Sequence, residues 1–127
     1  MSHTPAIATL LVADDEEGNK LILARRLKRE GYQIIDACDG EDAVQKIRGP
    51  RDEQRPCLVL MDINMPNMNS IEPTRILKNE FKDIPIIAVT ACVVDTFDYK
   101  DYGFDQLCLK PVDFTELLAK IKDSAIP

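Results

Sequence analysis

Residues Thr9–Asp15, with the sequence TLLVADD, form a short apolar run that ends in two acids. The part Thr9–Ala13 is long enough for a strand, and its nearly unbroken apolar character is typical of a strand covered on both faces. Comparable apolar runs follow at Cys57–Met61 and Ile84–Thr90. Three such runs predict the central strands of a parallel sheet.

Helical patterns separate these runs. The expected strands are Thr9–Ala13, Tyr32–Ala37, Cys57–Met61, Ile84–Thr90 and Leu107–Leu109, and the expected helices are Glu17–Glu30, Glu41–Arg48, one after Ser70 with Pro73 in its first turn, a weak one at Val94–Tyr102, and one from Asp113. Five βα units in a row predict a flavodoxin-like (βα)5 three-layer sandwich with parallel strand order 2-1-3-4-5. The two more polar or shorter strands, Tyr32–Ala37 and Leu107–Leu109, suit the sheet edges.

Length and charge limit what the chain can do. Its 127 residues, 45% of them apolar, fit one domain, expected at residues 8–127 behind a loose tail at 1–7. With 16 basic and 22 acidic residues, its net charge of -6 argues against nucleic-acid partners and direct membrane contact. We expect a cytoplasmic protein, because the sequence contains neither a secretory leader nor a bilayer-spanning run.

Acidic residues follow two neighbouring strands of the predicted sheet. Asp14 and Asp15 end the first strand, and Asp62 ends the third. Because adjacent strands lie about 5 Å apart, these carboxylates converge and repel one another unless a cation neutralises them. Oxygen ligands favour Mg²⁺ or Mn²⁺ over zinc, and the cysteines are scattered with His3 the single histidine.

Each of these residues also has an ordinary structural interpretation. Acids at a helix start are favoured by the helix dipole, and an aspartate after a strand often forms a turn. Thr90 at the end of the fourth strand could simply stop that strand, and Lys110 after the fifth could be a solvated charge. Together, however, four strands end in the carboxylates, hydroxyl and ammonium that phosphoryl transfer requires.

This constellation resembles the receiver domains of two-component response regulators over nearly the whole chain. The matching segments are Leu11–Asp15 for the acidic pair, Met61–Met68 for the phosphorylation loop, Val89–Ala91 for the switch strand and Leu109–Pro111 for the lysine-proline motif. The combination of motifs is specific, although each one alone is weak.

The resemblance implies a phosphorylation chemistry, residue by residue. Asp62 is expected to be the phosphoacceptor and a ligand of Mg²⁺ or Mn²⁺. The other expected contacts to the metal come from the Asp15 carboxylate, the Asn64 backbone carbonyl and Asp14 through water. Lys110 is expected to pair with the phosphoryl oxygens, and Thr90 to hydrogen-bond one of them.

The same resemblance implies the partners. They are a histidine kinase or a histidine phosphotransfer protein, and the chain is expected to be a monomer or weak dimer. It is expected to be a stand-alone receiver or part of a larger hybrid kinase, and not a turnover enzyme on an external substrate.

Three features depart from the family pattern. Asn69-Ser70 replaces the usual Asp-Gly after the phosphorylation loop, which changes the expected shape of that loop. Leu107 occupies the switch position where the family usually has an aromatic residue. The segment expected to form the fourth helix is unusually acidic, with Asp95, Asp98 and Asp101.

Two other functions remain open. A metal-dependent phosphatase with an aspartyl nucleophile would also use Asp62 and Lys110, but such enzymes usually carry an acid two residues after the nucleophile, where this chain has Asn64. A receiver-like interaction module that is not phosphorylated is the second alternative. The complete set of expected active-site residues argues against it.

Overall fold

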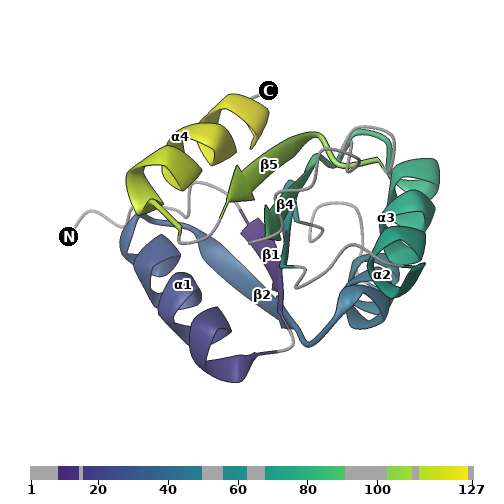
Figure 1. Cartoon of the computed structure of the whole chain (residues 1–127), viewed down its shortest axis with the longest axis horizontal. Helices are drawn as coiled ribbons and strands as arrows, with labels where there is room; N and C mark the ends of the chain where they lie inside the picture. The colour runs from purple at the N-terminus through teal and green to yellow at the C-terminus, as the bar shows by residue number, and fades with distance from the viewer. Residues whose placement is uncertain are drawn as a thin grey trace.

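The computed structural model describes residues 9–14, 16–49, 56–62, 68–90, 103–109 and 112–125. These residues form five strands and four helices, arranged around one central sheet (Figure 1). In chain order the elements are β1 (Thr9–Ala13), α1 (Glu17–Arg29), β2 (Gln33–Ala37), α2 (Gly40–Arg48), β3 (Leu58–Asp62), α3 (Met68–Glu80), β4 (Ile86–Thr90), β5 (Gln106–Leu109) and α4 (Phe114–Ala125).

The strands are all parallel and follow the order β2-β1-β3-β4-β5. This confirms the predicted sheet order, with β2 and β5 at the edges. Helices α1 and α4 cover one face of the sheet, and α2 and α3 cover the other (Figure 1). The predicted three-layer sandwich is therefore confirmed for the part of the chain that is described.

Strand alternation divides the core into two apolar clusters. Leu10, Val12, Leu60 and Val89 belong to the cluster on the α1/α4 face, which also contains Leu27, Leu117 and Ile121 from those helices. Leu11, Met61 and Ala88 belong to the cluster on the α2/α3 face, with Val44, Ile47 and Leu77. Because successive side chains point to opposite faces, the strand residues alternate between these clusters.

The observed ends of the elements agree with the predicted ones to within about two residues, as is usual for such boundaries. One prediction about α3 is nevertheless wrong. Helix α3 begins at Met68, so Pro73 lies inside it and not in its first turn. Pro73 lacks an N–H and removes one helical hydrogen bond, but the chain still turns helically before it. The weak helix predicted at Val94–Tyr102 lies outside the described residues.

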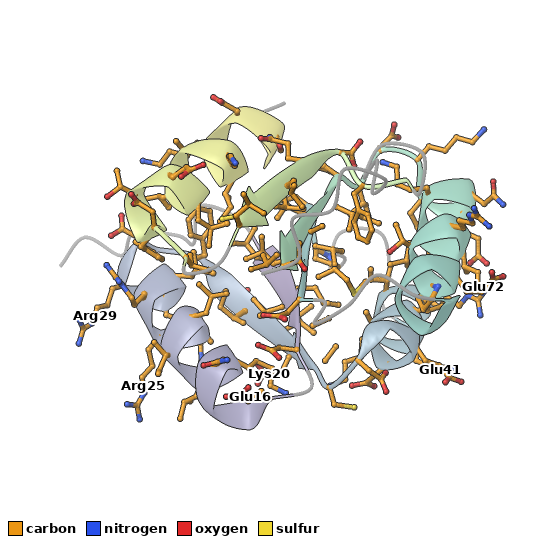
Figure 2. All side chains as sticks on the ribbon, viewed as in Figure 1. Glu16, Lys20, Arg25, Arg29, Glu41 and Glu72 are labelled. Atoms are coloured by element: carbon orange, nitrogen blue, oxygen red, sulfur yellow. The ribbon has the colours of Figure 1, made fainter. Side chains whose placement is uncertain are left out.

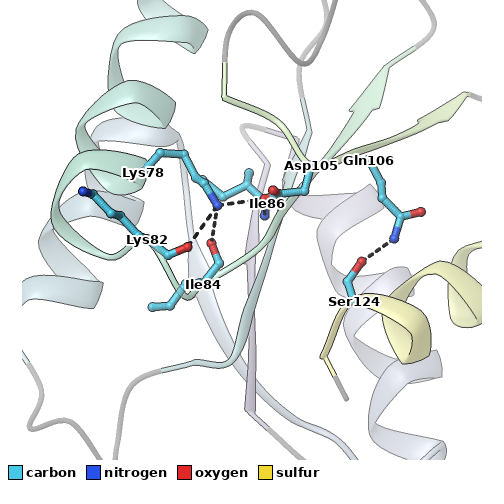
Figure 3. Close-up of polar contacts among 7 residues, drawn as sticks. All are labelled: Lys78, Lys82, Ile84, Ile86, Asp105, Gln106 and Ser124. Carbon is cyan, nitrogen blue, oxygen red and sulfur yellow. Dashed lines mark hydrogen bonds and ion pairs between the residues drawn. The ribbon is translucent and has the colours of Figure 1, made fainter. Parts of the chain in front are cut away.

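The amino ends of β4 and β5 are tied together by a polar cluster (Figure 3). The Asp105 carboxylate accepts hydrogen bonds from the backbone N–H of Ile86 at 2.7 Å and from Lys78 Nζ at 3.0 Å. Lys78 also donates to the backbone carbonyls of Lys82 and Ile84. This cluster fixes the end of the sheet opposite the predicted site, which keeps the strand registers defined.

Within the described ranges, no helix combines the length and the hydrophobicity needed to cross a membrane.

Candidate functional site

Asp14 and Asp62 leave the sheet side by side at its carboxyl end. Ala13 of β1 pairs with Met61 of β3, and the two aspartates are the next residues on these neighbouring strands. Each aspartate lies two positions after a residue of the α1/α4 cluster, so alternation places both on that face. The structure thus brings together two of the predicted site residues.

Both aspartates line one cavity of about 290 Å³ between the sheet, α1 and the start of α4. Its lining residues are Asp14, Asn19, Ile22, Leu23, Arg26, Asp62, Val89, Val112 and Phe114. The two carboxylates are the acidic members of this lining, and the walls are mostly apolar. A cavity with a few polar groups among mostly apolar walls is typical of a small-molecule binding site.

The Asp14 side chain is held in place by the start of α1. It is buried, with 4% of its surface exposed. Its Oδ1 accepts a hydrogen bond from the backbone N–H of Glu16 at 2.9 Å, and its own backbone N–H donates to the Ala37 carbonyl at 3.1 Å. These two bonds fix both the chain direction after β1 and the orientation of the carboxylate.

Asp62 is the last residue of β3, one residue later than the predicted end of that strand. Its backbone pairs with Val89 of β4, and its side chain is partly exposed. A partly exposed carboxylate at the open end of the sheet is accessible to a reactant from solvent. This position fits the predicted role of the nucleophile.

Thr90 ends β4 and is fully buried. It follows Val89, the strand partner of Asp62, and itself pairs with Leu109 of β5. It lies two residues after Ala88, which belongs to the α2/α3 cluster, so alternation points its side chain to the face opposite the cavity. Thr90 is therefore close to Asp62 at the carboxyl end of the sheet, but it is not among the residues that line the cavity.

Leu107 lies on β5 beside Ala88 and packs half-buried against the α2/α3 cluster. Its backbone carbonyl accepts a hydrogen bond from Lys120 Nζ of α4 at 2.6 Å. Its neighbour Gln106 donates from Nε2 to the Ser124 hydroxyl, also on α4 (Figure 3). Leu107 and its neighbour Gln106 are thus attached to α4 at the free edge of the sheet.

Three predicted site residues, Asp15, Asn64 and Lys110, lie outside the described residues. In the described ranges no group of three or more His, Cys, Asp or Glu side chains gathers to hold a metal ion. The described residues do supply two adjacent carboxylates, Asp14 and Asp62. A hard divalent cation prefers oxygen ligands of this kind, so the described part of the site fits Mg²⁺ or Mn²⁺.

The sequence interpretation missed the far wall of the cavity. The Arg26 guanidinium of α1 lies 4.1 Å from the centre of the Phe114 ring of α4, a cation–π contact that joins the two helices. The spacing of Asn19, Ile22, Leu23 and Arg26 puts one side of α1 along the cavity, but no local signal in the sequence indicates the contact of Arg26 with Phe114.

Comparisons with known proteins agree with this geometry. A model of the response regulator receiver domain matches residues 10–122. The CAI-1 autoinducer sensor kinase/phosphatase CqsS of Vibrio cholerae is 34% identical over 122 residues, which cover 88% of this chain and 16% of that protein. The chain therefore spans only a small part of the length of this relative.

Solved structures give the same result. The response regulator TrrA of Thermotoga maritima, in complex with Mg²⁺–BeF, is 32% identical with a TM-score of 0.78, covering 92% of this chain and 98% of that one. TrrA in complex with the histidine kinase ThkA is 31% identical with a TM-score of 0.79, covering 94% of this chain and 100% of that one. The chain belongs to the response regulator receiver domain family of two-component signalling.

Proposed function

We propose that this receiver domain accepts a phosphoryl group on Asp62 from a phosphohistidine of a histidine kinase or a histidine phosphotransfer protein. The observation that carries the proposal is the placement of Asp14 and Asp62 at adjacent strand ends in one cavity. Apolar residues of α1 and α4 line the cavity beside the carboxylates, and Asp62 is partly exposed.

In this proposal an Asp62 carboxylate oxygen attacks the phosphorus of the phosphohistidine. The new O–P bond forms as the P–N bond breaks, and the histidine nitrogen leaves with the electron pair of that bond. Asp14 keeps its orientation through the Glu16 N–H and contributes negative charge beside the nucleophile. That charge attracts a cation to the site and disfavours the anionic phosphoryl group when no cation is bound.

We propose Mg²⁺ or Mn²⁺ as the cation, held by Asp15, Asp62 and the Asn64 carbonyl, with Asp14 acting through water. When bound, it would neutralise the charge that develops on the transferring phosphoryl oxygens. TrrA, a structural neighbour with 32% identity, was crystallised in complex with Mg²⁺–BeF, which supports the choice of metal.

Lys110 and Thr90 are proposed to act on the phosphoryl group after transfer. Lys110 would pair with its oxygens. The Thr90 hydroxyl would rotate to donate a hydrogen bond to one of them, which requires a change from its present buried orientation. Such a change biases a two-state equilibrium of the loops after β3 and β4, as phosphorylation does in switches of this kind.

The phosphodonor is proposed to dock on α1 beside the site. Gly18, Asn19 and Ile22 are exposed there, and Asn19 and Ile22 also line the cavity. An apolar helix of the partner laid on this surface would bring its histidine to the cavity entrance. The neighbour TrrA in complex with the histidine kinase ThkA supports a partner of this class.

The test is incubation with phosphoramidate, a small phosphodonor, followed by intact mass measurement. We expect the wild-type protein with Mg²⁺ to gain the mass of one phosphoryl group, which hydroxylamine then removes as expected for an acyl phosphate. With EDTA, or in Asp62→Asn, no gain is expected. Label that persists on a serine or threonine of Asp62→Asn would contradict the proposal. Continuous release of phosphate with many turnovers would favour the phosphatase alternative.

A further inference from the structure

Helix α1 is basic in an acidic protein. The chain has 16 basic and 22 acidic residues, and five of the basic ones but only one acid lie between Glu17 and Arg29. Lys20 is buried, whereas Arg25, Arg26, Lys28 and Arg29 are exposed. This concentration of positive charge runs against the net charge of the molecule.

The exposed residues form an ordered surface. Gly18, Ile22, Arg25 and Arg29 follow one another at helical spacings of three and four residues, so they share the outer side of α1. Leu21 and Ile22 are 53% and 62% exposed, among the few large apolar side chains this exposed in the described ranges. The side chains of Arg25 and Arg29 extend away from the body of the protein (Figure 2). We call Leu21, Ile22, Arg25 and Arg29 the α1 ridge.

The cations of the described residues fall into two groups, and Arg75, Lys82 and Lys122 share the unpaired group with those of the α1 ridge. Lys46, Arg48, Lys78 and Lys120 each pair with a carboxylate. In the described part of the chain Arg25 and Arg29 pair with none. The helix dipole favours cations in the last turn of a helix, but Arg25 precedes that turn. The dipole accounts for Arg29, which lies in the last turn, whereas neither the dipole nor an ion pair within the described residues accounts for Arg25.

The ridge is continuous with the proposed reaction site. Ile22 lines the cavity that contains Asp14 and Asp62, and Arg25 and Arg29 lie about 5 and 10 Å farther along the helix axis. A helix packed along α1 would meet apolar side chains next to the reacting groups and cations at the far end.

We propose that the α1 ridge selects a phosphodonor whose docking helix is apolar near its histidine and acidic about two turns away. This inference rests on the proposed function and adds the chemistry of the partner to it. Charge complementarity of this kind speeds association and rejects partners whose helix is basic. Glu30 follows Arg29 directly and forms no ion pair with it in the described residues, and Glu41 and Glu72 lie on the opposite side of the molecule (Figure 2).

The test uses three fluorescent synthetic helical peptides and the intact chain. The first peptide has a leucine face flanked by glutamates, the second has the same leucine face flanked by lysines, and the third has the glutamates without the leucines. Binding is measured by anisotropy at low and high salt, and the contact surface is mapped by NMR shifts. We expect the first peptide to bind along α1, more weakly at high salt, and the other two to bind poorly.

Variants identify the residues responsible. R25E/R29E should bind the first peptide about tenfold more weakly and prefer the second, because two exposed ion pairs become repulsive. R25Q/R29Q, which avoids acids near the helix end, should show a smaller loss. R75E/K82E changes two exposed cations of the α3 region by the same charge and should bind as the wild type does.

Several results would overturn the inference. These are equal binding of the first and second peptides, NMR shifts away from α1, or an equal loss in R75E/K82E. Tighter binding to phosphatidylserine vesicles than to any peptide would also overturn it. So would self-association, seen by sedimentation, that the variant R25E/R29E abolishes. Wild-type phosphorylation by phosphoramidate is measured in parallel: its failure would refute the proposed function while leaving the peptide result to stand on its own.

Discussion

Replacing Asp14 with Asn separates the structural role of this residue from its electrostatic role. Asn keeps an oxygen that can accept the hydrogen bond of the Glu16 N–H, and it removes one of two like charges at adjacent strand ends. Two carboxylates about 5 Å apart repel by about 1 to 3 kcal/mol, depending on how well water screens them. The Asp62 side chain is partly exposed, so water screens the repulsion and puts the expected value at the lower limit.

We therefore expect Asp14→Asn to raise the free energy of unfolding by about 1 kcal/mol in EDTA. Asp14→Ala also loses the charge-assisted hydrogen bond, which costs about 1.5 to 3 kcal/mol, and so should be neutral or destabilised. Urea unfolding measures both. Magnesium affinity should fall by about 10- to 100-fold in either variant, as is typical when a group next to the metal ligands is removed.

The control is Asp83→Asn, which removes an exposed acid in the turn before β4. It should change neither the magnesium affinity nor the free energy of unfolding measured in EDTA. If Asp14→Asn destabilises the protein in EDTA, or leaves the magnesium affinity unchanged, the electrostatic account of the acidic pair is refuted.

Three further predictions concern Lys110, Asp42 and Leu107. Lys110→Ala should bind Mg²⁺ in calorimetry as the wild type does but accept phosphate from phosphoramidate poorly, because its ammonium is assigned to the phosphoryl oxygens; lost Mg²⁺ binding would contradict that role. The hydrogen bond from the backbone N–H of Cys38 lowers the pKa of the Asp42 carboxyl below its ordinary value of 3.8. The folded state therefore favours the charged form of Asp42, so the wild type should be more stable than Asp42→Asn above pH 3.8. This difference in the free energy of unfolding, measured with urea, should shrink as acid protonates the carboxyl in the folded state. A difference that grows in acid would refute the prediction. Amide hydrogen exchange is compared with and without beryllofluoride, a mimic of the phosphoryl group. The largest changes in protection should fall at 67–70 and 91–95, and protection around Leu107 should change little because the Leu107 carbonyl accepts a hydrogen bond from α4. The reverse pattern would show that Leu107 moves.

The sheet could be predicted because its signals are local and redundant. Each central strand is a continuous apolar run, and each is followed by a helical period that allows only a parallel arrangement. The starting point of α3 could not be predicted in this way. Pro73 is compatible with a first turn, and the sequence contains no local reason for the helix to begin at Met68 and not after Ser70.

The pairing of Asp14 with Asp62 could also be predicted, because both end strands that the topology makes neighbours. The burial of Asp14 and the cavity beside it could not. They depend on how α1 and α4 pack, and the Arg26–Phe114 contact joins residues far apart in the sequence. Local patterns contain no information about such a contact, since it arises from the angle between two helices.

The most direct test of the central claim is to locate the phosphoryl group on the chain. After incubation with phosphoramidate and Mg²⁺, borohydride reduces an aspartyl phosphate to homoserine, which peptide mass spectrometry identifies by position. We expect homoserine at position 62 alone, and none when EDTA is present. Homoserine at Asp14 or Asp15, or phosphate on a hydroxyl side chain with position 62 unmodified, would contradict it.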